Sequence, residues 1–234
     1  MVMEDLLQFR RGRLSLDTNL VLRTTAVLLV GGFLLIAAFE WDNTLQELTL
    51  PDKILQAAFQ SISPRTAGFA SLPLAEMADE SQFVTMGLMF IGGGSGSTAG
   101  GIKVGTLAIL IAVVFSAIRG RANVEVAGRE IRRTEADKAL AVVALSGGLV
   151  FVVTLLLSAI EHQAFLPLAY EATSAFGTVG LSTGVTPGLS DLGLGILALT
   201  MFLGRLGPLT LALVLIQGTR PERRRLPDER VRIG

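Results

Sequence analysis

A long internal repeat constrains the fold of this sequence more than any other feature. A Thr-x-Gly motif at residues 66–69 recurs at residues 178–181, and the same spacing separates Asp79 from Asp191. In each copy, a charge-poor segment that is too short to cross a bilayer precedes the motif, and a long apolar segment follows it. This order predicts two tandem units of helix, re-entrant pore loop and helix.

Long stretches without charge place these units in a membrane. Half of the residues are hydrophobic and only 17% are charged, against about 25% in an ordinary soluble domain. A membrane-spanning helix needs about 20 mostly apolar residues. Four stretches approach or exceed this length with at most one internal charge: residues 24–39, 81–102, 139–160 and 191–220. The sequence therefore predicts an all-α membrane protein.

The basic residues predict its orientation. Sixteen of the twenty Lys and Arg lie at residues 10–23, 119–138 and 220–232. By the positive-inside rule these three clusters are cytoplasmic, so an even number of crossings separates them. The first apolar segment lacks a cleavage site and is read as a retained span. We expect a multi-pass protein of the inner (plasma) membrane with both termini in the cytoplasm.

The two half-length segments, residues 54–64 and 166–176, can enter and leave the membrane on the same side. Irregular backbone at this depth is tolerated only where protein or a water-filled cavity satisfies it. Backbone carbonyls after a half-helix can replace the hydration shell of an ion, and glycine permits the backbone angles that this requires. Ordinary loops with a turn glycine are the alternative, but two copies in register favour a selectivity filter.

A glycine-rich stretch at residues 92–103 interrupts the second long segment of the first unit. Each glycine destabilises a helix by about 1 kcal/mol relative to alanine, so a broken helix is predicted. The stretch is not a nucleotide-binding P-loop, because Ile102 separates Gly101 from Lys103 and Val104 follows. The chain has no cysteine and one histidine, His162, without a second ligand at metal-binding spacing. No chemistry is indicated, and we do not expect an enzyme.

Three charged residues near the predicted pore have alternative interpretations. Arg205 lies in the last apolar segment, where a charge marks either an ion pathway or a structural partner for carbonyl groups that Pro208 releases. Lys103 is either part of the glycine-rich stretch or a residue that reaches the cytoplasmic surface. Glu171, on the second half-length segment, is expected to bond to backbone near the filter, with a direct ion ligand as the less favoured alternative.

These motifs together resemble the Trk/Ktr/HKT superfamily of potassium transporters. The resemblance rests on residues 64–69, 92–103, 175–184 and 204–210, and on the ending at residues 229–234. It covers nearly the whole chain and is strongest to the third and fourth repeats of a bacterial Ktr-type membrane subunit. Family members arrange four such repeats around one pore.

The resemblance implies a role for each motif. The implied filter residues, which bind the ion, are Thr66, Ala67, Gly68, Phe69, Thr178, Val179, Gly180 and Leu181. The implied gating residues form an intramembrane loop and an arginine below the filter: Gly92, Gly93, Gly94, Ser95, Gly96, Ser97, Thr98, Gly100, Gly101, Lys103 and Arg205.

The expected function is passive, gated potassium uptake through a half-pore that needs further repeats. No cofactor is expected in this chain, only K⁺ or Na⁺ as the transported ion. The implied partners are membrane lipid, a second copy or a complementary amino-terminal half, and a cytosolic nucleotide-binding RCK ring; no nucleic acid is expected. Because the first two repeats are missing, a truncated, non-conducting assembly or regulatory subunit and a sodium-permeable transporter are the alternatives.

The predicted organisation has four parts. Residues 1–120 form the first helix-pore loop-helix repeat with its cytoplasmic start, and residues 121–138 form a basic cytoplasmic linker. Residues 139–219 form the second repeat, and residues 220–234 form a cytoplasmic tail.

Overall fold

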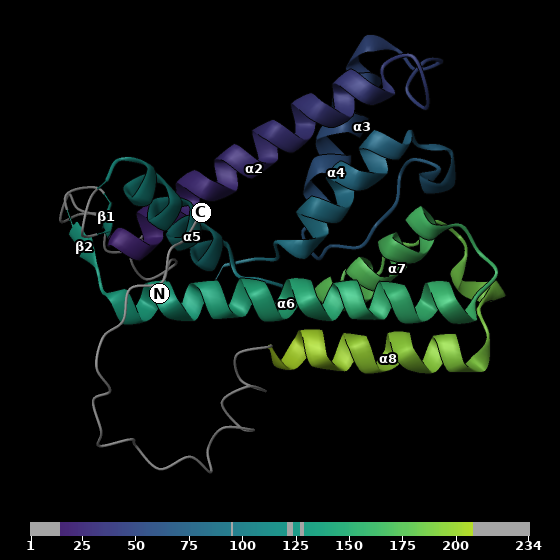
Figure 1. Cartoon of the computed structure of the whole chain (residues 1–234). Helices are drawn as coiled ribbons and strands as arrows, with labels where there is room; N and C mark the ends of the chain where they lie inside the picture. The colour runs from purple at the N-terminus through teal and green to yellow at the C-terminus, as the bar shows by residue number, and fades with distance from the viewer. Residues whose placement is uncertain (1–14, 95, 121–123, 127–128, 208–234) are drawn as a thin grey trace.

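The computed structural model describes residues 15–94, 96–120, 124–126 and 129–207. In these residues the chain is mostly helical (Figure 1). The α-helices are α2 (Leu16–Glu40), α3 (Leu50–Ile62), α4 (Asp79–Phe90), α5 (Val104–Ile118), α6 (Arg133–Ile160), α7 (Phe165–Gly177) and α8 (Asp191–Leu206). The predicted tail at residues 220–234, most of the amino-terminal basic cluster and Ser95 lie outside the described residues.

Two of these helices are long and apolar enough to cross a membrane. α2 has 25 residues and α6 has 28, which correspond to about 38 and 42 Å at 1.5 Å per residue. The hydrocarbon core of a bilayer is about 30 Å thick. α2 begins at an N-cap, Ser15, whose hydroxyl accepts a hydrogen bond from the Thr18 amide at 3.2 Å. Both helices can therefore span the bilayer with residues to spare.

α3 and α7 have 13 residues each, so each is about 20 Å long and too short to span. Each lies between a long helix and a shorter one, and each is followed by irregular chain and a 3₁₀ turn, η2 (Leu74–Glu76) or η3 (Thr186–Gly188). The two 3₁₀ turns, and the starts of α4 and α8, are offset by the spacing that separates the two Thr-x-Gly motifs. The order of elements is thus repeated along the chain.

The glycine-rich stretch separates α4 from α5 and closes on itself at its two ends. Ile91 and Ile102 form an isolated parallel bridge. The Gly92 amide donates to the Ile102 carbonyl at 2.8 Å, and the Ile102 amide donates to the Phe90 carbonyl at 3.0 Å. The helix is broken as predicted, and backbone hydrogen bonds hold the two ends of the break together.

Of the predicted span over residues 191–220, the structure describes residues 191–207. α8 ends at Leu206, and Gly207, the last residue described, has a φ of +84°. This left-handed conformation suits glycine and cannot continue a right-handed helix. Arg205, which the sequence placed in the middle of a continuous helix, instead lies in the last turn of α8.

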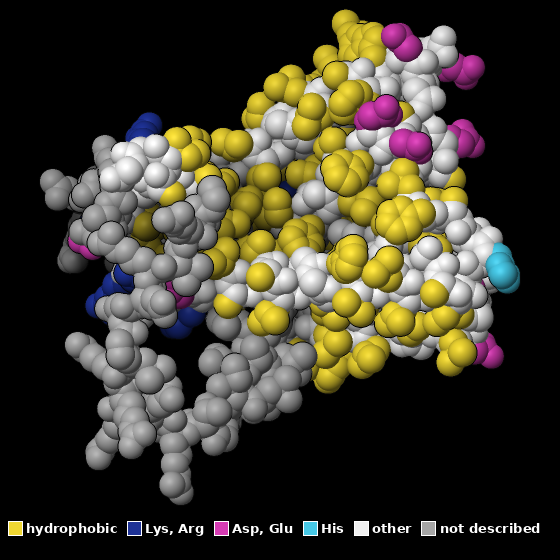
Figure 2. All heavy atoms as spheres, viewed as in Figure 1, with side chains coloured by type: hydrophobic (Ala, Val, Ile, Leu, Met, Phe, Trp, Pro, Cys, Tyr) yellow, Lys and Arg dark blue, Asp and Glu magenta, His cyan; other side chains and the backbone are white. Residues whose placement is uncertain are grey.

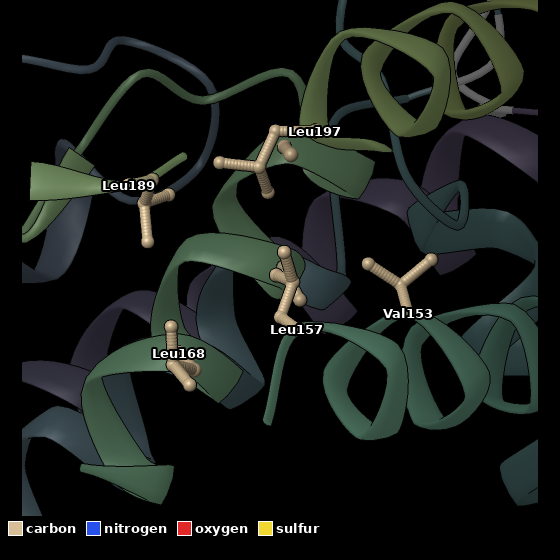
Figure 3. Packing of buried hydrophobic residues seen from close by; sticks show 7 residues of the cluster. Val153, Leu157, Leu168, Leu189 and Leu197 are labelled. Atoms are coloured by element: carbon tan, nitrogen blue, oxygen red, sulfur yellow. The ribbon is translucent and has the colours of Figure 1, made fainter. Parts of the chain in front are cut away.

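α7 contacts both α6 and α8 of the second unit and also contacts α4 of the first unit; Figure 1 shows it beside α6, on the side that faces α4. Side chains of α6, α7 and α8 meet in one apolar cluster, in which Leu157 and Leu168 are fully buried (Figure 3). A second cluster joins the units, because Met89 of α4 packs with Tyr170 of α7 and with Val179. α7 is therefore fixed from three sides.

A buried carboxylate ends the first helix of each unit and binds the start of the second helix. Glu40, the last residue of α2, accepts a hydrogen bond from the amide of Ala78, the N-cap of α4, at 2.9 Å. Glu161, directly after α6, accepts from the amide of Ser190, the N-cap of α8, at 3.1 Å. Each contact stabilises a helix start with a negative charge.

The surface is largely apolar. Hydrophobic side chains cover much of the visible face (Figure 2), and exposed ones include Val27 of α2, Phe83 of α4 and Leu192 of α8. Such extended apolar surface is typical of a membrane-facing or interface-forming protein. Most of the visible Asp and Glu side chains lie toward the right-hand end in Figure 2, and the visible Lys and Arg toward the left-hand end.

Two short strands interrupt the helical chain. β1 (Val124–Val126) pairs antiparallel with β2 (Arg129–Ile131). α6 then begins at Arg133, so it reaches into the segment that the sequence assigned to a basic linker, residues 121–138.

Candidate functional site

The two Thr-x-Gly motifs meet in the structure. A Cβ atom at Gly68 would overlap the carbonyl oxygen of Val179 and would lie 3.8 Å from the Cα atom of Gly180. Gly68 and Gly180 both have positive φ, +77° and +94°. Two segments from distant parts of the sequence are thus in backbone contact.

The threonine of each motif also has left-handed backbone. Thr66 has a φ of +72° and Thr178 of +51°, and among the described residues they are the non-glycine residues with positive φ. This conformation is unfavourable for a β-branched side chain and persists only where its surroundings enforce it. Backbone strain of this kind is concentrated at functional sites.

Each half-length helix ends at its motif and binds the motif's amide groups. At the end of α3, the amides of Ala67 and Gly68 donate to the Ser63 carbonyl at 3.0 and 3.1 Å. At the end of α7, the amides of Thr178 and Val179 donate to carbonyls of the last turn, both at 3.0 Å. The carboxyl end of a helix carries a partial negative charge, so both helices direct a cation-attracting end at the motifs.

Six carbonyl groups of the motifs accept no hydrogen bond from any residue that the structure describes. Unpaired carbonyls beside left-handed glycines are suited to binding a dehydrated cation. These carbonyls belong to Thr66, Ala67, Gly68, Thr178, Val179 and Gly180.

The last residue of each implied filter segment lies in a different environment from its counterpart. Phe69 is exposed, whereas Leu181 is buried with Val179 in the cluster between the units. Ser63 fixes Phe69, because its hydroxyl accepts from the Phe69 amide at 2.9 Å and donates to the Phe69 carbonyl.

The glycine-rich loop lies directly against the second motif. A Cβ atom at Gly100 would overlap the Thr178 hydroxyl and would lie 2.6 Å from the Gly177 carbonyl oxygen. The Thr178 hydroxyl is buried without a hydrogen-bond partner among the described residues. Only a residue without a side chain allows this approach, so the loop lies directly against the carboxyl end of α7.

Two basic side chains bind carbonyl groups of the loop. Arg205 of α8 donates a hydrogen bond from its guanidinium to the Thr98 carbonyl. Lys103 donates from its ammonium group to the Ala99 carbonyl, so it binds within the loop and does not extend away from it. These contacts bring two of the implied gating residues to the same turn of the loop.

Backbone hydrogen bonds shape the rest of the loop. The Ser97 amide donates to the Gly94 carbonyl at 3.1 Å, and the Val104 amide donates to the Gly93 carbonyl, also at 3.1 Å. Ser95 lies outside the described residues, so its predicted role has no structural counterpart here. The other implied gating residues, which the structure places in the same loop, are Gly92, Gly96 and Gly101.

Sequence reasoning missed Arg65. Its guanidinium donates to the Gly92 carbonyl at 3.4 Å, at the first residue of the glycine-rich loop. The signal was present, since Arg65 directly precedes the first Thr-x-Gly motif and is the only charged residue between Lys53 and Glu76. Arg65 of the first unit and Arg205 of the second unit thus bind carbonyl groups of the same loop, at Gly92 and at Thr98.

The described residues contain no group of three or more His, Cys, Asp or Glu side chains that could hold a metal ion. The oxygen atoms that the two motifs offer to a cation are backbone carbonyls and the hydroxyls of Thr66 and Thr178. Such ligands suit weakly held cations that must leave as readily as they bind.

Comparison with known proteins identifies relatives of this architecture. The family model "TrkH: Cation transport protein" matches residues 2–220. The chain is 39% identical over its full length to the Ktr system potassium uptake protein B of Bacillus subtilis, of which it covers 53%. It is 35% identical over its full length to the potassium/sodium uptake protein NtpJ of Enterococcus hirae, again covering 53%.

The fold also resembles a solved structure. The potassium transporter TrkH from Vibrio parahaemolyticus superposes with a TM-score of 0.67 over 84% of this chain and 43% of that one, at 22% identity. The likeness shows a shared helical fold. The chain spans about half the length of the curated relatives that it matches.

Proposed function

The chain belongs to the TrkH family of cation transport proteins, and on this premise we propose that it supplies half of a gated pore for potassium uptake. In this proposal the two Thr-x-Gly motifs are two of the strands that form a selectivity filter. Carbonyl groups of these strands replace the water around the ion, and α3 and α7 are the pore helices that support them.

The contact between Gly68 and Val179 carries the proposal. A filter requires strands from different repeats to approach one axis with unpaired carbonyls, and the two motifs combine a close approach with unpaired carbonyls. The alternative of two ordinary loops explains neither the positive φ of both threonines nor the two helix ends directed at them.

Potassium is the proposed ion because the names of two relatives, from Bacillus subtilis and Enterococcus hirae, both include potassium uptake. The second name also includes sodium. Sodium permeation is therefore the second candidate, and ion competition distinguishes the two.

The loop at residues 92–103 is proposed as the gate. Its contact with the Thr178 side of the filter would obstruct the path, and the hydrogen bonds from Arg205, Lys103 and Arg65 would hold it there. Each hydrogen bond from a charged donor contributes about 1.5–3 kcal/mol. Two or three such bonds are enough to bias a gate whose states differ by a few kcal/mol.

A complete filter needs strands beyond the two described here. We propose that they come from a second copy, from a complementary amino-terminal half, or from chain continuous with this sequence. We further propose a multi-pass arrangement in the plasma membrane with cytoplasmic termini, and regulation by a cytosolic nucleotide-binding RCK ring. The apolar lengths of α2 and α6 and the three basic clusters support this arrangement.

Flux in liposomes tests the proposal. Purified protein is reconstituted with and without a complementary half, and potassium efflux down a gradient is measured beside chemical crosslinking of the same vesicles. Efflux is expected only from samples in which crosslinking traps a species larger than the monomer. Robust potassium efflux from vesicles that contain only monomer would contradict the half-pore.

A further inference from the structure

A buried carboxylate lies behind the second filter segment. Glu171 of α7 is only 5% exposed. One of its oxygens accepts from the Ser182 hydroxyl at 2.7 Å and from the Thr183 amide at 3.0 Å. The other accepts from the Thr186 hydroxyl at 2.7 Å. A single side chain thus binds three residues of the chain that leaves the filter.

The chain that Glu171 holds is fixed at one end by the buried Leu181, and beyond that residue it depends on hydrogen bonds to side chains. Gly180 and Gly184 lie within it, with φ of +94° and +91°. Glycine has more accessible backbone conformations than any other residue, so contacts made near these two glycines decide the backbone direction. The Gly184 amide also donates to the Ser182 hydroxyl at 3.0 Å, which extends the network from Glu171 across the whole turn.

Packing does not replace these hydrogen bonds. A cavity of about 380 Å³ lies beside the turn, and its wall includes Glu171, Gly180, Thr186, Leu197 and Met201. The last two are on α8, so the turn is separated from that helix by open space along this side. The hydrogen bonds to Glu171 are therefore the main restraint on this face of the turn.

The carboxylate makes these contacts without a cationic partner. Among the described residues no Lys or Arg forms an ion pair with Glu171. Its charge is balanced by hydroxyl and amide dipoles, and hydrogen bonds to an ionised acceptor are roughly twice as strong as those to a neutral one.

The first unit has no equivalent. At the spacing of the internal repeat, the counterpart of Glu171 is Phe59. The first filter segment is fixed by a hydroxyl, that of Ser63, at the Phe69 backbone. A neutral hydroxyl therefore fixes the first segment, and a carboxylate fixes the second.

We propose that Glu171 is a positioning residue for ion discrimination: it fixes the turn at residues 182–186 and, through it, the direction of the Gly180 and Leu181 carbonyls. This inference rests on the proposed function of the filter. It adds that the second segment depends on a buried negative charge and the first does not.

Hydrogen exchange followed by mass spectrometry tests the positioning step without any transport. The variants are Glu171→Gln, which keeps the shape and removes the charge, and Thr186→Val, which removes one hydroxyl partner. Exchange in the peptide that covers residues 178–186 should be about tenfold faster in Glu171→Gln, the factor expected for about 1.4 kcal/mol of lost hydrogen bonding. Thr186→Val should give a smaller increase, and the peptide that covers residues 66–72 should not change.

The matched control is Glu47→Gln, which removes a negative charge from an exposed position between α2 and α3. It should leave exchange in both peptides unchanged. Equal exchange at residues 178–186 in wild type and in folded Glu171→Gln and Thr186→Val proteins would overturn the positioning role.

Ion competition tests the discrimination step in a conducting assembly. The ratio of potassium to sodium uptake should fall several-fold in Glu171→Gln and remain unchanged in Glu47→Gln. Loss of total flux at an unchanged ratio, together with faster exchange, would reduce Glu171 to a structural residue and overturn the proposal. Absence of cation flux from every wild-type assembly would instead contradict the proposed function, and the exchange result would still decide the positioning role.

Discussion

The guanidinium of Arg205 donates a hydrogen bond to the carbonyl oxygen of Thr98, which joins the last turn of α8 to the glycine-rich loop. Further along that loop, Gly100 lies against Thr178. The loop is therefore held between a basic side chain and the end of the proposed filter, and the strength of the arginine contact should set how readily the loop leaves it.

Removing either the loop or the arginine contact should open the path. Deletion of residues 94–100 is expected to raise potassium flux in a complete assembly, and Arg205→Ala is expected to raise it too. The arginine acts through the loop, so Arg205→Ala should add less to the deletion than it adds to wild type. The measurement is initial potassium flux in vesicles with equal amounts of folded protein.

Arg205→Lys is the control for charge, because lysine keeps the positive charge and a hydrogen-bond donor but lacks the planar guanidinium. Its flux should lie between those of wild type and Arg205→Ala. Wild-type flux in both the deletion and the Arg205→Ala protein would mean that the loop is not a gate.

The two filter glycines should differ in their tolerance of a side chain. At Gly68 a Cβ atom meets both an unfavourable φ of +77° and the Val179 carbonyl, whereas at Gly180 the φ is +94° but the space is open. Gly68→Ser should therefore weaken potassium over sodium discrimination more than Gly180→Ser. Competition between the two ions measures the ratio.

Gly147→Ser on α6 is the matched control, because a Cβ atom there meets nothing within 4 Å and the residue lacks a positive φ. Unchanged selectivity in both filter variants would remove these glycines from the ion path.

Gly204 should be intolerant of alanine although it lies in a helix. A Cβ atom there would overlap the Phe176 carbonyl oxygen, next to the end of α7. Overpacking of this kind typically lowers the free energy of unfolding by about 1–3 kcal/mol. Gly195→Ala on the same helix meets nothing within 4 Å and should be neutral or stabilising, since alanine favours helix by about 1 kcal/mol.

Thermal unfolding in detergent compares these two variants directly. Equal midpoints for Gly204→Ala and Gly195→Ala would show that α7 and α8 are less closely packed than described.

The buried carboxylate Glu161 should contribute to stability through the start of α8. Glu161→Ala removes the acceptor of the Ser190 amide and hydroxyl, and a hydrogen bond to a charged group contributes about 1.5–3 kcal/mol. Glu161→Gln keeps an acceptor oxygen and should lose less. Unfolding by denaturant should give the stability order wild type, Gln, Ala, and a Glu161→Ala protein as stable as wild type would contradict the capping role.

Properties set by local sequence were predictable. The length of the segment before each Thr-x-Gly motif indicated a helix too short to span, and α3 and α7 have 13 residues each. The glycines from Gly92 to Gly101 indicated a broken helix, because glycine weakens a helix wherever it occurs. The mostly helical membrane fold follows from these features together with the long apolar runs.

Properties set by tertiary contacts were not predictable. The contact of Arg65 with the Gly92 carbonyl depends on how the glycine-rich loop folds back toward the first motif within the first unit, and sequence spacing does not encode it. The end of α8 at Leu206 was not predicted because the apolar run continues toward residue 220, although Pro208 disfavours helical backbone at Gly207. The function of Glu161 as a helix cap likewise depends on a partner that lies far along the chain, beyond the whole of α7.

The backbone bridge between Ile91 and Ile102 has a mechanical consequence. It ties the end of α4 to the start of α5 by a path that bypasses the intervening loop, and the Val104 amide reinforces it through the Gly93 carbonyl at 3.1 Å. A pull on the far end of α5 would act first on this bridge, before the chain between Ile91 and Ile102 is stretched. The hydrogen-bonded bridge and the loop therefore connect α4 and α5 by two separate paths. Force on α5 would reach α4 through the bridge without stretching the loop.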